Sequence, residues 1–169
     1  MVIEELLDIV SEADEVMGVE SRSIIYEKKL SCFRVVNGFI INSEKKIWIP
    51  RRHPQKKIFP LHLDASVGGH VSSGESYEQA FIRETQEEVN IILTPEMLKP
   101  LARLTPAQDA TSSFMWVYGI FQDNAPNYNT DDFVDAYWLS IDEFFELLSQ
   151  GEKVKDDLPI MLGKLKKIL

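Results

Sequence analysis

Apolar and polar positions repeat with two different periods along the chain, which predicts a mixture of helices and strands. Residues 76–89 (SYEQAFIRETQEEV) place mostly apolar side chains four positions apart, which is typical of a helix with one buried face. Ser76 followed by Gln79 is a capping-box pattern and favours a helix start at that point. We expect a helix over 76–89 whose core-facing stripe is Tyr77, Phe81, Thr85 and Val89.

Short apolar runs bounded by turn residues predict strands in the rest of the chain. These runs are 34–42, 46–50, 97–104, 113–122 and 134–139, with a hairpin turn at 43–45. Helical spacing of apolar positions 3, 6, 7 and 10 favours a helix over 2–17 that stops at Gly18. Closing helices are expected at 141–149 and 157–168, and the basic, proline-containing segment 51–62 is expected to be a loop. Mixed strands and helices predict an α/β or α+β domain.

Length and composition narrow the class of protein. A chain of 169 residues suits one domain, and its 44% hydrophobic residues suffice for a core. The sequence contains no apolar stretch of roughly the 18 residues that a membrane span needs, so no membrane partner is expected. The first ten residues carry Glu4, Glu5 and Asp8 but no basic residue, unlike a targeting peptide. The single Cys32 cannot form an internal disulfide, so we expect a cytoplasmic protein.

The charge balance limits the partners that the protein can bind. Eighteen basic and 27 acidic residues give a net charge of −9. This balance disfavours duplex nucleic acid, whose phosphate backbone needs a positive footprint. Small phosphorylated substrates remain compatible, because a metal ion can bridge acidic side chains and phosphate oxygens.

Three carboxylates within the expected helix are the first candidate chemistry. Glu84, Glu87 and Glu88 are spaced i, i+3, i+4 and therefore share one helix face. Such a triplet can be a solvated acidic face. It can also be a site for a hard divalent cation, which prefers oxygen ligands and offsets the repulsion between the carboxylates.

The spacing around these carboxylates resembles the signature of the Nudix hydrolase family. Gly69 is followed after five residues by Glu75, and after seven more by Arg83 and Glu84. Glu87 and Glu88 then occupy their signature positions, so all six charged or leading-glycine positions match. Two positions depart from the pattern: Thr85 replaces an aliphatic residue, and Asn90 replaces a glycine that needs positive φ, where Asn is the next-best residue.

The resemblance implies a fold and a set of roles. It implies a Nudix-type α/β/α sandwich with a mixed central sheet over 30–169, preceded by an N-terminal helix and lead-in segment over 1–29. Mg²⁺, or Mn²⁺, would be bound by Glu84, Glu87 and Glu88, with the Gly69 carbonyl as a possible further ligand. Arg83 would pair with Glu75. Glu87 or Glu88 would serve as general base, unless a distant loop supplies it; the loop residues Asp109, Asp131 and Asp132 also fit solvated turns.

Residues 51–71 resemble the Nudix branch that includes isopentenyl-diphosphate isomerase. In that branch the sequence S-V-C-G-H supplies a catalytic cysteine and a metal-binding histidine. Here the stretch is Ser66 to His70, and Gly68 stands at the cysteine position. Upstream, where the isomerase has further histidine ligands, this chain offers Arg34 and no histidine. The glutamates that the isomerase uses on a later strand are also absent from 113–122, so isomerisation is disfavoured.

Several other side chains have both a substrate-binding and a structural interpretation. Arg51, Arg52, Lys56 and Lys57 could meet substrate phosphates or form a solvated basic loop. His70 could line the site or be structural. Phe59, Trp48 and Trp116 could stack on a substrate ring or belong to the core. The segments 105–113 and 122–132 are expected to contribute to substrate choice.

Together these observations predict a hydrolase that cleaves a diphosphate linkage in a small organic substrate, such as a nucleoside-diphosphate-like compound. Two alternatives remain: an isomerase-like enzyme, and a non-catalytic sensor that binds a nucleotide. The family resemblance also makes a homodimer possible.

Overall fold

The centre of the molecule is strand β3 (Arg34–Ile41), which has neighbours along its whole length in this computed structural model of residues 3–169. On one side it pairs in parallel with β7 (Phe114–Phe121), from Arg34 opposite Phe114 to Ile41 opposite Phe121. On the other side it pairs antiparallel with β5 (Val67–His70) at residues 35–38, and with β4 (Ile47–Arg52) only at Ile41. On this side β3 therefore changes partner along its length, from β5 at residues 35–38 to β4 at Ile41.

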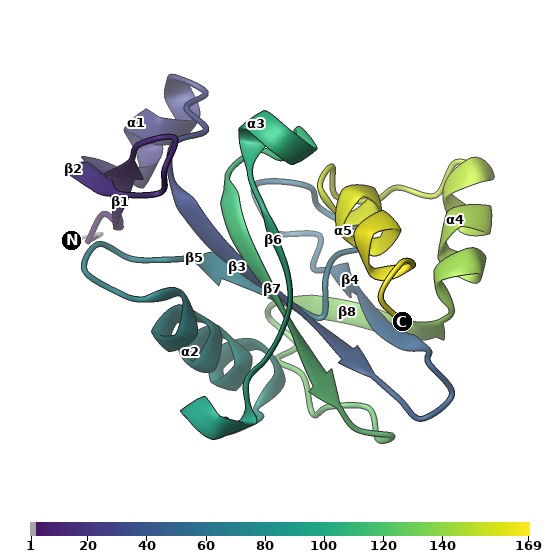
Figure 1. Cartoon of the computed structure of the whole chain (residues 1–169). Coiled ribbons are helices and arrows are strands. Elements are labelled where there is room, and N and C mark those ends of the chain that lie inside the picture. Colours follow the sequence, from purple (N-terminus) through teal and green to yellow (C-terminus); the bar gives the residue numbers. More distant parts are fainter. Residues whose placement is uncertain (1–2) are drawn as a thin grey trace.

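The remaining strands complete a mixed six-stranded sheet. β6 (Lys99–Leu104) pairs antiparallel with β7, and β8 (Phe133–Leu139) pairs antiparallel with β4. Helix α2 (Tyr77–Val89) covers one face, while α4 (Ile141–Ser149) and α5 (Leu158–Leu165) cover the other (Figure 1). Two short elements flank β6: the 3-10 turn Pro95–Met97 and helix α3 (Pro106–Asp109). This arrangement confirms the expected α/β/α layering around a mixed sheet.

Alternation along β3 divides the core between these two layers. Val36 and Ile40 pack under α2 with Phe81 and Tyr118. Phe39 and Ile41 face the opposite way and pack with residues of α4 and α5, including Phe144 and Leu162. Successive strand residues point to opposite faces, so a β strand buried on both sides must be apolar throughout. This explains the apolar run in residues 35–41, broken only by Asn37 and Gly38.

The N-terminal part differs from the prediction. Instead of a helix over 2–17, the chain forms a hairpin of β1 (Leu6–Val10) and β2 (Val16–Ser21), followed by the short helix α1 (Arg22–Glu27). Gly18 lies inside β2 and ends no helix. Residues 1 and 2, where the expected segment begins, lie outside the described residues. The hairpin and α1 sit beside the start of β3, at one end of the sheet (Figure 1).

The other expected elements are confirmed with shifted ends. Arg51 and Arg52, expected in a loop, belong to the end of β4, opposite Asp135 and Phe133 of β8. The strand expected from residue 97 starts at Lys99, and the last helix covers Leu158–Leu165. None of the helices formed by residues 3–169 has the length and hydropathy needed to cross a membrane.

Candidate active site

Helix α2 is fixed at both ends by the residues that the sequence singled out. The Ser76 Oγ accepts from the Gln79 backbone N–H at 3.1 Å, and the Ser76 N–H donates to Gln79 Oε1 at 2.9 Å. At the other end Asn90 has a φ of 54°, the left-handed conformation that Asn adopts more readily than most residues. The departure at Asn90 therefore preserves the helix stop. The other departure, Thr85, is buried in the core stripe, where its Oγ1 has no hydrogen-bond partner among residues 3–169.

Arg83 joins α2 to the loop that precedes it. Its guanidinium donates from Nε and Nη2 to the two carboxylate oxygens of Glu75, both at 2.9 Å. It also donates from Nη1 to Glu84 Oε1 at 2.7 Å and from Nη2 to the carbonyl of His70 at 3.1 Å. The expected Arg83–Glu75 pair is therefore present. It is bidentate, which fixes direction as well as distance.

Gly69 allows Glu84 to lie against the backbone of β5. A Cβ atom at position 69 would come within 2.0 Å of Glu84 Cδ, far closer than van der Waals contact allows. A larger residue at position 69 would therefore displace the Glu84 carboxyl group from the strand. The Gly69 backbone and the Glu84 carboxyl group are thereby brought together, as the motif predicted.

The three carboxylates have different surroundings. Glu88 is half-buried, and its Oε2 accepts a hydrogen bond from the Gly68 N–H at 2.9 Å. Burial, reinforced by nearby Glu84, raises the pKa of Glu88 well above its ordinary value. Burial also raises the pKa of Glu84 to about 7, against the opposing effect of Arg83. The side chain of Glu87 is 58% exposed and lies 3.5 Å from Arg83 Nη1.

These residues fit a hard divalent cation. Within residues 3–169, no three His, Cys, Asp or Glu side chains already converge as a metal-binding group. Glu84 and Glu88 are nevertheless carboxyls whose ionised forms are penalised by burial. A cation removes such a penalty, and an all-oxygen donor set is the one that Mg²⁺ and Mn²⁺ prefer.

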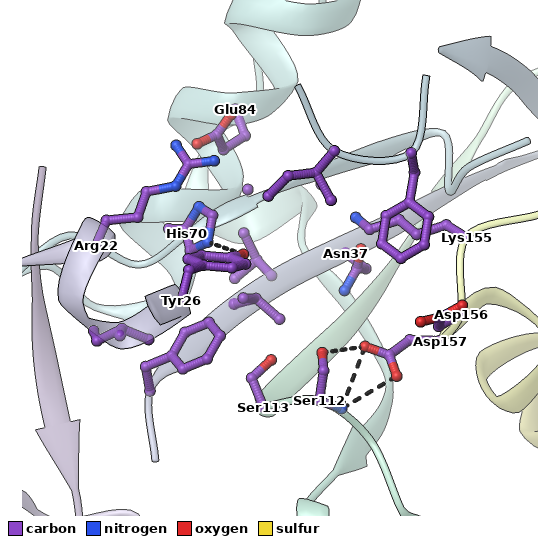
Figure 2. Close-up of a pocket in the computed structure, with 18 of the residues that line it drawn as sticks. Arg22, Tyr26, Asn37, His70, Glu84, Ser112, Ser113, Lys155, Asp156 and Asp157 are labelled. Atoms are coloured by element: carbon purple, nitrogen blue, oxygen red, sulfur yellow. Dashed lines mark hydrogen bonds between the residues drawn. The ribbon is translucent and has the colours of Figure 1, made fainter. Parts of the chain in front are cut away.

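A cavity of about 750 Å³ opens beside these carboxylates. It is lined by Glu84, Glu87, Glu88, Gly69 and His70 from the α2 side, and by Arg22, Ile25 and Tyr26 from α1 (Figure 2). Asn37 on β3, Ser113 before β7, and Lys155 before α5 line it as well. The cavity therefore lies beside the part of β3 that pairs with β5, and elements from both halves of the chain enclose it.

His70 lines the cavity and also has a structural role. The Tyr26 hydroxyl and His70 Nε2 are hydrogen-bonded at 2.9 Å, and the Phe33 ring stacks on the imidazole with centroids 5.9 Å apart. Burial, together with the positive charges of Arg22, Lys155 and Arg83, lowers the pKa of His70 to about 3. The imidazole is therefore neutral at physiological pH. It connects α1 to β5.

The basic residues of 51–57 are engaged within the protein. Arg51 does not line the cavity; it donates to Glu152 from Nη1 at 2.8 Å and from Nη2 at 3.2 Å. Arg52 lines the cavity, but its guanidinium bonds Asp64 at 2.7 Å and the carbonyls of Ile58 and Phe59. Lys56 pairs with Asp132, and Lys57 is exposed outside the cavity. Arg52 and Lys56 therefore lie at the cavity as ion-paired residues, whereas Arg51 and Lys57 lie outside it, and their contact with substrate phosphates stays a prediction.

The remaining sequence candidates separate into cavity and scaffold. Phe59 and Asp132 line the cavity. Trp48 is a core residue against Phe133, and Trp116 lies over a small separate hollow with Tyr118. Asp109 accepts from Lys164 and from the Thr105 N–H, and Asp131 is exposed; neither lines the cavity.

The loop 122–132 is attached to the end of α2. The Asn129 N–H donates to the carbonyl of Glu88 at 2.7 Å, and the Asn90 side chain donates to the carbonyl of Asn127. The loop that was expected to influence substrate choice therefore contacts the backbone of a site carboxylate directly.

Sequence reasoning missed the contribution of α1. Arg22, Tyr26 and Lys29 line the cavity, yet α1 has only six residues and no repeat from which its inward face could be read. Lys155 and Ser113 were also missed, because each enters the cavity through contacts with residues far away in the sequence.

Comparison with known proteins places the chain in a family. The family model described as NUDIX domain matches residues 33–160. An uncharacterised Nudix hydrolase of Nostoc sp. is 51% identical over 154 residues, covering 91% of each chain. A Nudix hydrolase of Deinococcus radiodurans is 43% identical over 160 residues, covering 93% of this chain and 91% of its own.

Structural comparison agrees with these matches. The crystal structure of DR0079 from Deinococcus radiodurans superposes with a TM-score of 0.87 at 42% identity, covering 95% of this chain and 98% of that one. Isopentenyl-diphosphate Delta-isomerase 1 of Photorhabdus laumondii is a distant relative, 22% identical over 149 residues that cover 86% of this chain and 85% of its own. The chain therefore belongs to the Nudix family of hydrolases, whose members act on phosphorus-containing acid anhydrides.

Proposed function

We propose that this chain is a Mg²⁺- or Mn²⁺-dependent hydrolase that cleaves the diphosphate linkage of a small organic substrate, such as a nucleoside-diphosphate-like compound. One observation carries the proposal: α2 presents Glu84, Glu87 and Glu88, next to Gly69, to one cavity of about 750 Å³. Such a volume is typical of small-molecule sites. The substrate binds in this cavity with its diphosphate next to the carboxylates.

Glu84, Glu87, Glu88 and the Gly69 carbonyl would hold the divalent cation, which would supply charge neutralisation of the diphosphate and activation of water. The chain's own residues supply position and proton transfer. Arg83 holds Glu84 in place and ties α2 to the backbone of β5 through the His70 carbonyl.

Glu88 and Glu87 are the two candidates for the general base. Glu88 Oε2 is held by the Gly68 N–H, so Oε1 is the atom of Glu88 that can take a proton from the attacking water. Glu87 is the more exposed of the two and lies on the same helix face. Both line the cavity, and substitution of each separates their roles.

The packing around Gly68 argues against the isomerase alternative. Gly68 carries no thiol where the isomerase has its catalytic cysteine, and a larger residue there would displace the Asn37 amide, whose Oδ1 lies 2.9 Å from the position of a Cβ atom. Isomerisation of isopentenyl diphosphate is therefore not the reaction that this site supports. The sensor alternative predicts binding of a nucleotide without turnover.

A substrate panel tests the proposal. The protein is incubated with Mg²⁺ and a set of nucleoside and other organic diphosphates, and the released phosphorylated products are measured with and without a chelator. Glu88→Gln should lower kcat by about 10²- to 10⁴-fold if Glu88 is the base, and Glu87→Gln is tested in parallel. Glu78→Gln, an exposed residue in the first turn of the same helix, is the matched control and should retain full activity.

Three results would contradict the proposal. One is that no diphosphate is cleaved in the presence of Mg²⁺ or Mn²⁺. Another is near-wild-type turnover in both the Glu87 and the Glu88 variants. Tight binding of a nucleotide that is never cleaved would favour the sensor.

A further inference from the structure

The N-terminal segment before residue 33 lies outside the part of the chain that matches the family model, yet it forms one wall of the cavity. Leu7 of β1 and Ile25 of α1 are fully buried and pack with Phe33, which is 4% exposed. A segment with its own buried cluster is a fixed part of the fold. The side chains that it points into the cavity are therefore held in defined positions.

Two buried carboxylates fix this segment to the domain. Asp14, in the turn between β1 and β2, accepts from Arg34 Nε at 2.6 Å, from the Tyr77 hydroxyl at 2.8 Å and from Arg103 Nη2 at 3.2 Å. Asp8 on β1 accepts from Ser73 Oγ at 2.7 Å and from the Gly74 N–H at 3.1 Å. Because Ser73 and Gly74 belong to the loop before α2, these bonds hold the N-terminal segment against the motif that carries the carboxylates.

Helix α1 brings a guanidinium to this wall. Figure 2 shows the Arg22 side chain reaching from α1 to the part of the cavity where Glu84 lies. Nη1 of Arg22 donates to Glu5 Oε2 at 3.1 Å, and Cζ of Arg22 lies 5.7 Å from the centre of the Tyr26 ring. A guanidinium has five N–H donors, and among residues 3–169 no side-chain or backbone acceptor is hydrogen-bonded to Nε or Nη2 of Arg22.

Two of the other cations of the cavity, Arg52 and Lys56, are engaged with protein oxygens. Arg52 donates from Nε, Nη1 and Nη2 to protein oxygens, and Lys56 pairs with Asp132. Lys155 Nζ lies 3.5 Å from Asp64 Oδ1, and the buried carboxylate of Asp64 also pairs with Arg52. Lys29, just after α1, adds positive charge to the same wall as Arg22. Arg22 and Lys29 therefore bring positive charge to the N-terminal side of the cavity, where Glu5 also lies and accepts from Arg22.

We propose that Arg22 binds an oxygen of the substrate's diphosphate from the side opposite the α2 carboxylates, so that the N-terminal segment completes the substrate site. This inference rests on the proposed diphosphate hydrolase function. A diphosphate between Glu84 and Arg22 is neutralised from two sides: by the cation that the carboxylates hold, and by the guanidinium. The planar fork of arginine matches two phosphate oxygens, which a lysine cannot reproduce.

Binding of a non-hydrolysable diphosphate tests this role without relying on turnover. Titration calorimetry with imidodiphosphate and Mg²⁺ should show affinity reduced about tenfold or more for Arg22→Gln, because a hydrogen bond between charged groups is lost. Arg22→Lys should recover part of the loss, since it restores charge but not the fork. Lys28→Gln, which removes one positive charge from an exposed residue next to α1 that does not line the cavity, is the matched control and should bind like wild type.

Steady-state kinetics on any substrate found by the panel provides a second readout. Arg22→Gln should raise KM by about tenfold while changing kcat less, since the contact is made in the bound ground state as well. Three results would overturn the inference: unchanged affinity in Arg22→Gln, an equal loss in Lys28→Gln, or no binding of imidodiphosphate by the wild type. The hydrolase proposal fails on a different observation, the absence of diphosphate cleavage.

Discussion

Two regions meet at the same cavity and are built in different ways: the motif loop with α2, and the N-terminal hairpin with α1. The first is a 13-residue helix with its capping box, its core stripe and its carboxylates all within 22 residues of sequence. The second consists of two short strands and a six-residue helix held by carboxylates whose partners lie up to 89 residues away. One part of a site can therefore be predicted from a local motif, whereas another part depends on long-range contacts that the motif does not contain.

The largest expected difference in activity and stability comes from substituting one glycine in each region. Gly69→Ala would place a Cβ atom 2.0 Å from Glu84 Cδ, whereas a Cβ atom on Gly18 of β2 meets nothing within 4 Å. We expect Gly69→Ala to lower kcat by about 100-fold through displacement of Glu84, and to destabilise the fold by about 1–3 kcal/mol. Gly18→Ala should change stability by less than about 0.5 kcal/mol.

Product assays and urea denaturation of the two variants measure this difference. If Gly69→Ala keeps wild-type activity, the close approach of β5 and Glu84 has no functional role. A large effect of Gly18→Ala would mean that the hairpin is more tightly packed on that face than its contacts indicate.

Asp14 tests how firmly the N-terminal region is attached. Asp14→Ala removes the shared acceptor of Arg34, Tyr77 and Arg103, and the side chains of Asp14 and Arg34 are only 9% and 16% exposed. Removing one partner of such an enclosed pair leaves the other charge unpaired, so we expect a loss of about 2–4 kcal/mol in the free energy of unfolding. Glu12→Ala, in the same turn but exposed, is the control for urea denaturation.

Substrate affinity in the Asp14 variant sharpens the comparison. If α1 carries a substrate contact, Asp14→Ala should weaken binding of imidodiphosphate at temperatures where the protein remains folded. Unchanged affinity together with lost stability would separate the attachment of the hairpin from the properties of the cavity.

The smallest expected effect is the pH dependence of stability that Glu84, in the motif region, produces. The pKa of Glu84 is about 7 in the folded, metal-free protein against 4.5 ordinarily, so the folded state binds this proton more tightly than the unfolded state does. The contribution of Glu84 to the stability of the metal-free protein should therefore fall as pH rises from about 4.5 to about 7, whereas the lowered pKa of His70 contributes in the opposite direction. Glu84→Gln should be more stable than wild type by about 1–3 kcal/mol near pH 8, and about equal to it below pH 4.5.

Thermal or urea unfolding of both proteins across this pH range measures the effect. Saturating Mg²⁺ should reverse the order at high pH, because the cation stabilises the ionised glutamate. A stability difference between wild type and Glu84→Gln that is independent of pH between 4.5 and 7 would contradict the raised pKa of Glu84.

The fold was predictable wherever local periodicity determined the structure. Residues 76–89 carry a capping box and a core stripe, and both are present in α2. The expected helix over 2–17 was wrong. The spacing of Ile3, Leu6, Leu7 and Val10 fits a helix. In the structure, however, this segment is a strand in which Asp8 is buried against Ser73 and Gly74. That second fact depends on a contact 65 residues away, which the local pattern cannot contain.

The candidate site was predictable to the same extent. The motif spacing located the carboxylates, Gly69 and the Arg83–Glu75 pair. Arg51 was expected near phosphate, but its partner Glu152 lies 101 residues further along the chain. Arg22 was not singled out, because its place in the cavity depends on how the hairpin docks onto β3.

The hydrogen bond from the Asn129 N–H to the carbonyl of Glu88 has a consequence for engineering this enzyme. A chimera that exchanges 122–132 for the loop of a relative would also alter the support of the last turn of α2. Selectivity and turnover would then change together, so a library that varies this segment should keep its length and exclude proline at position 129, because the donor is the backbone N–H.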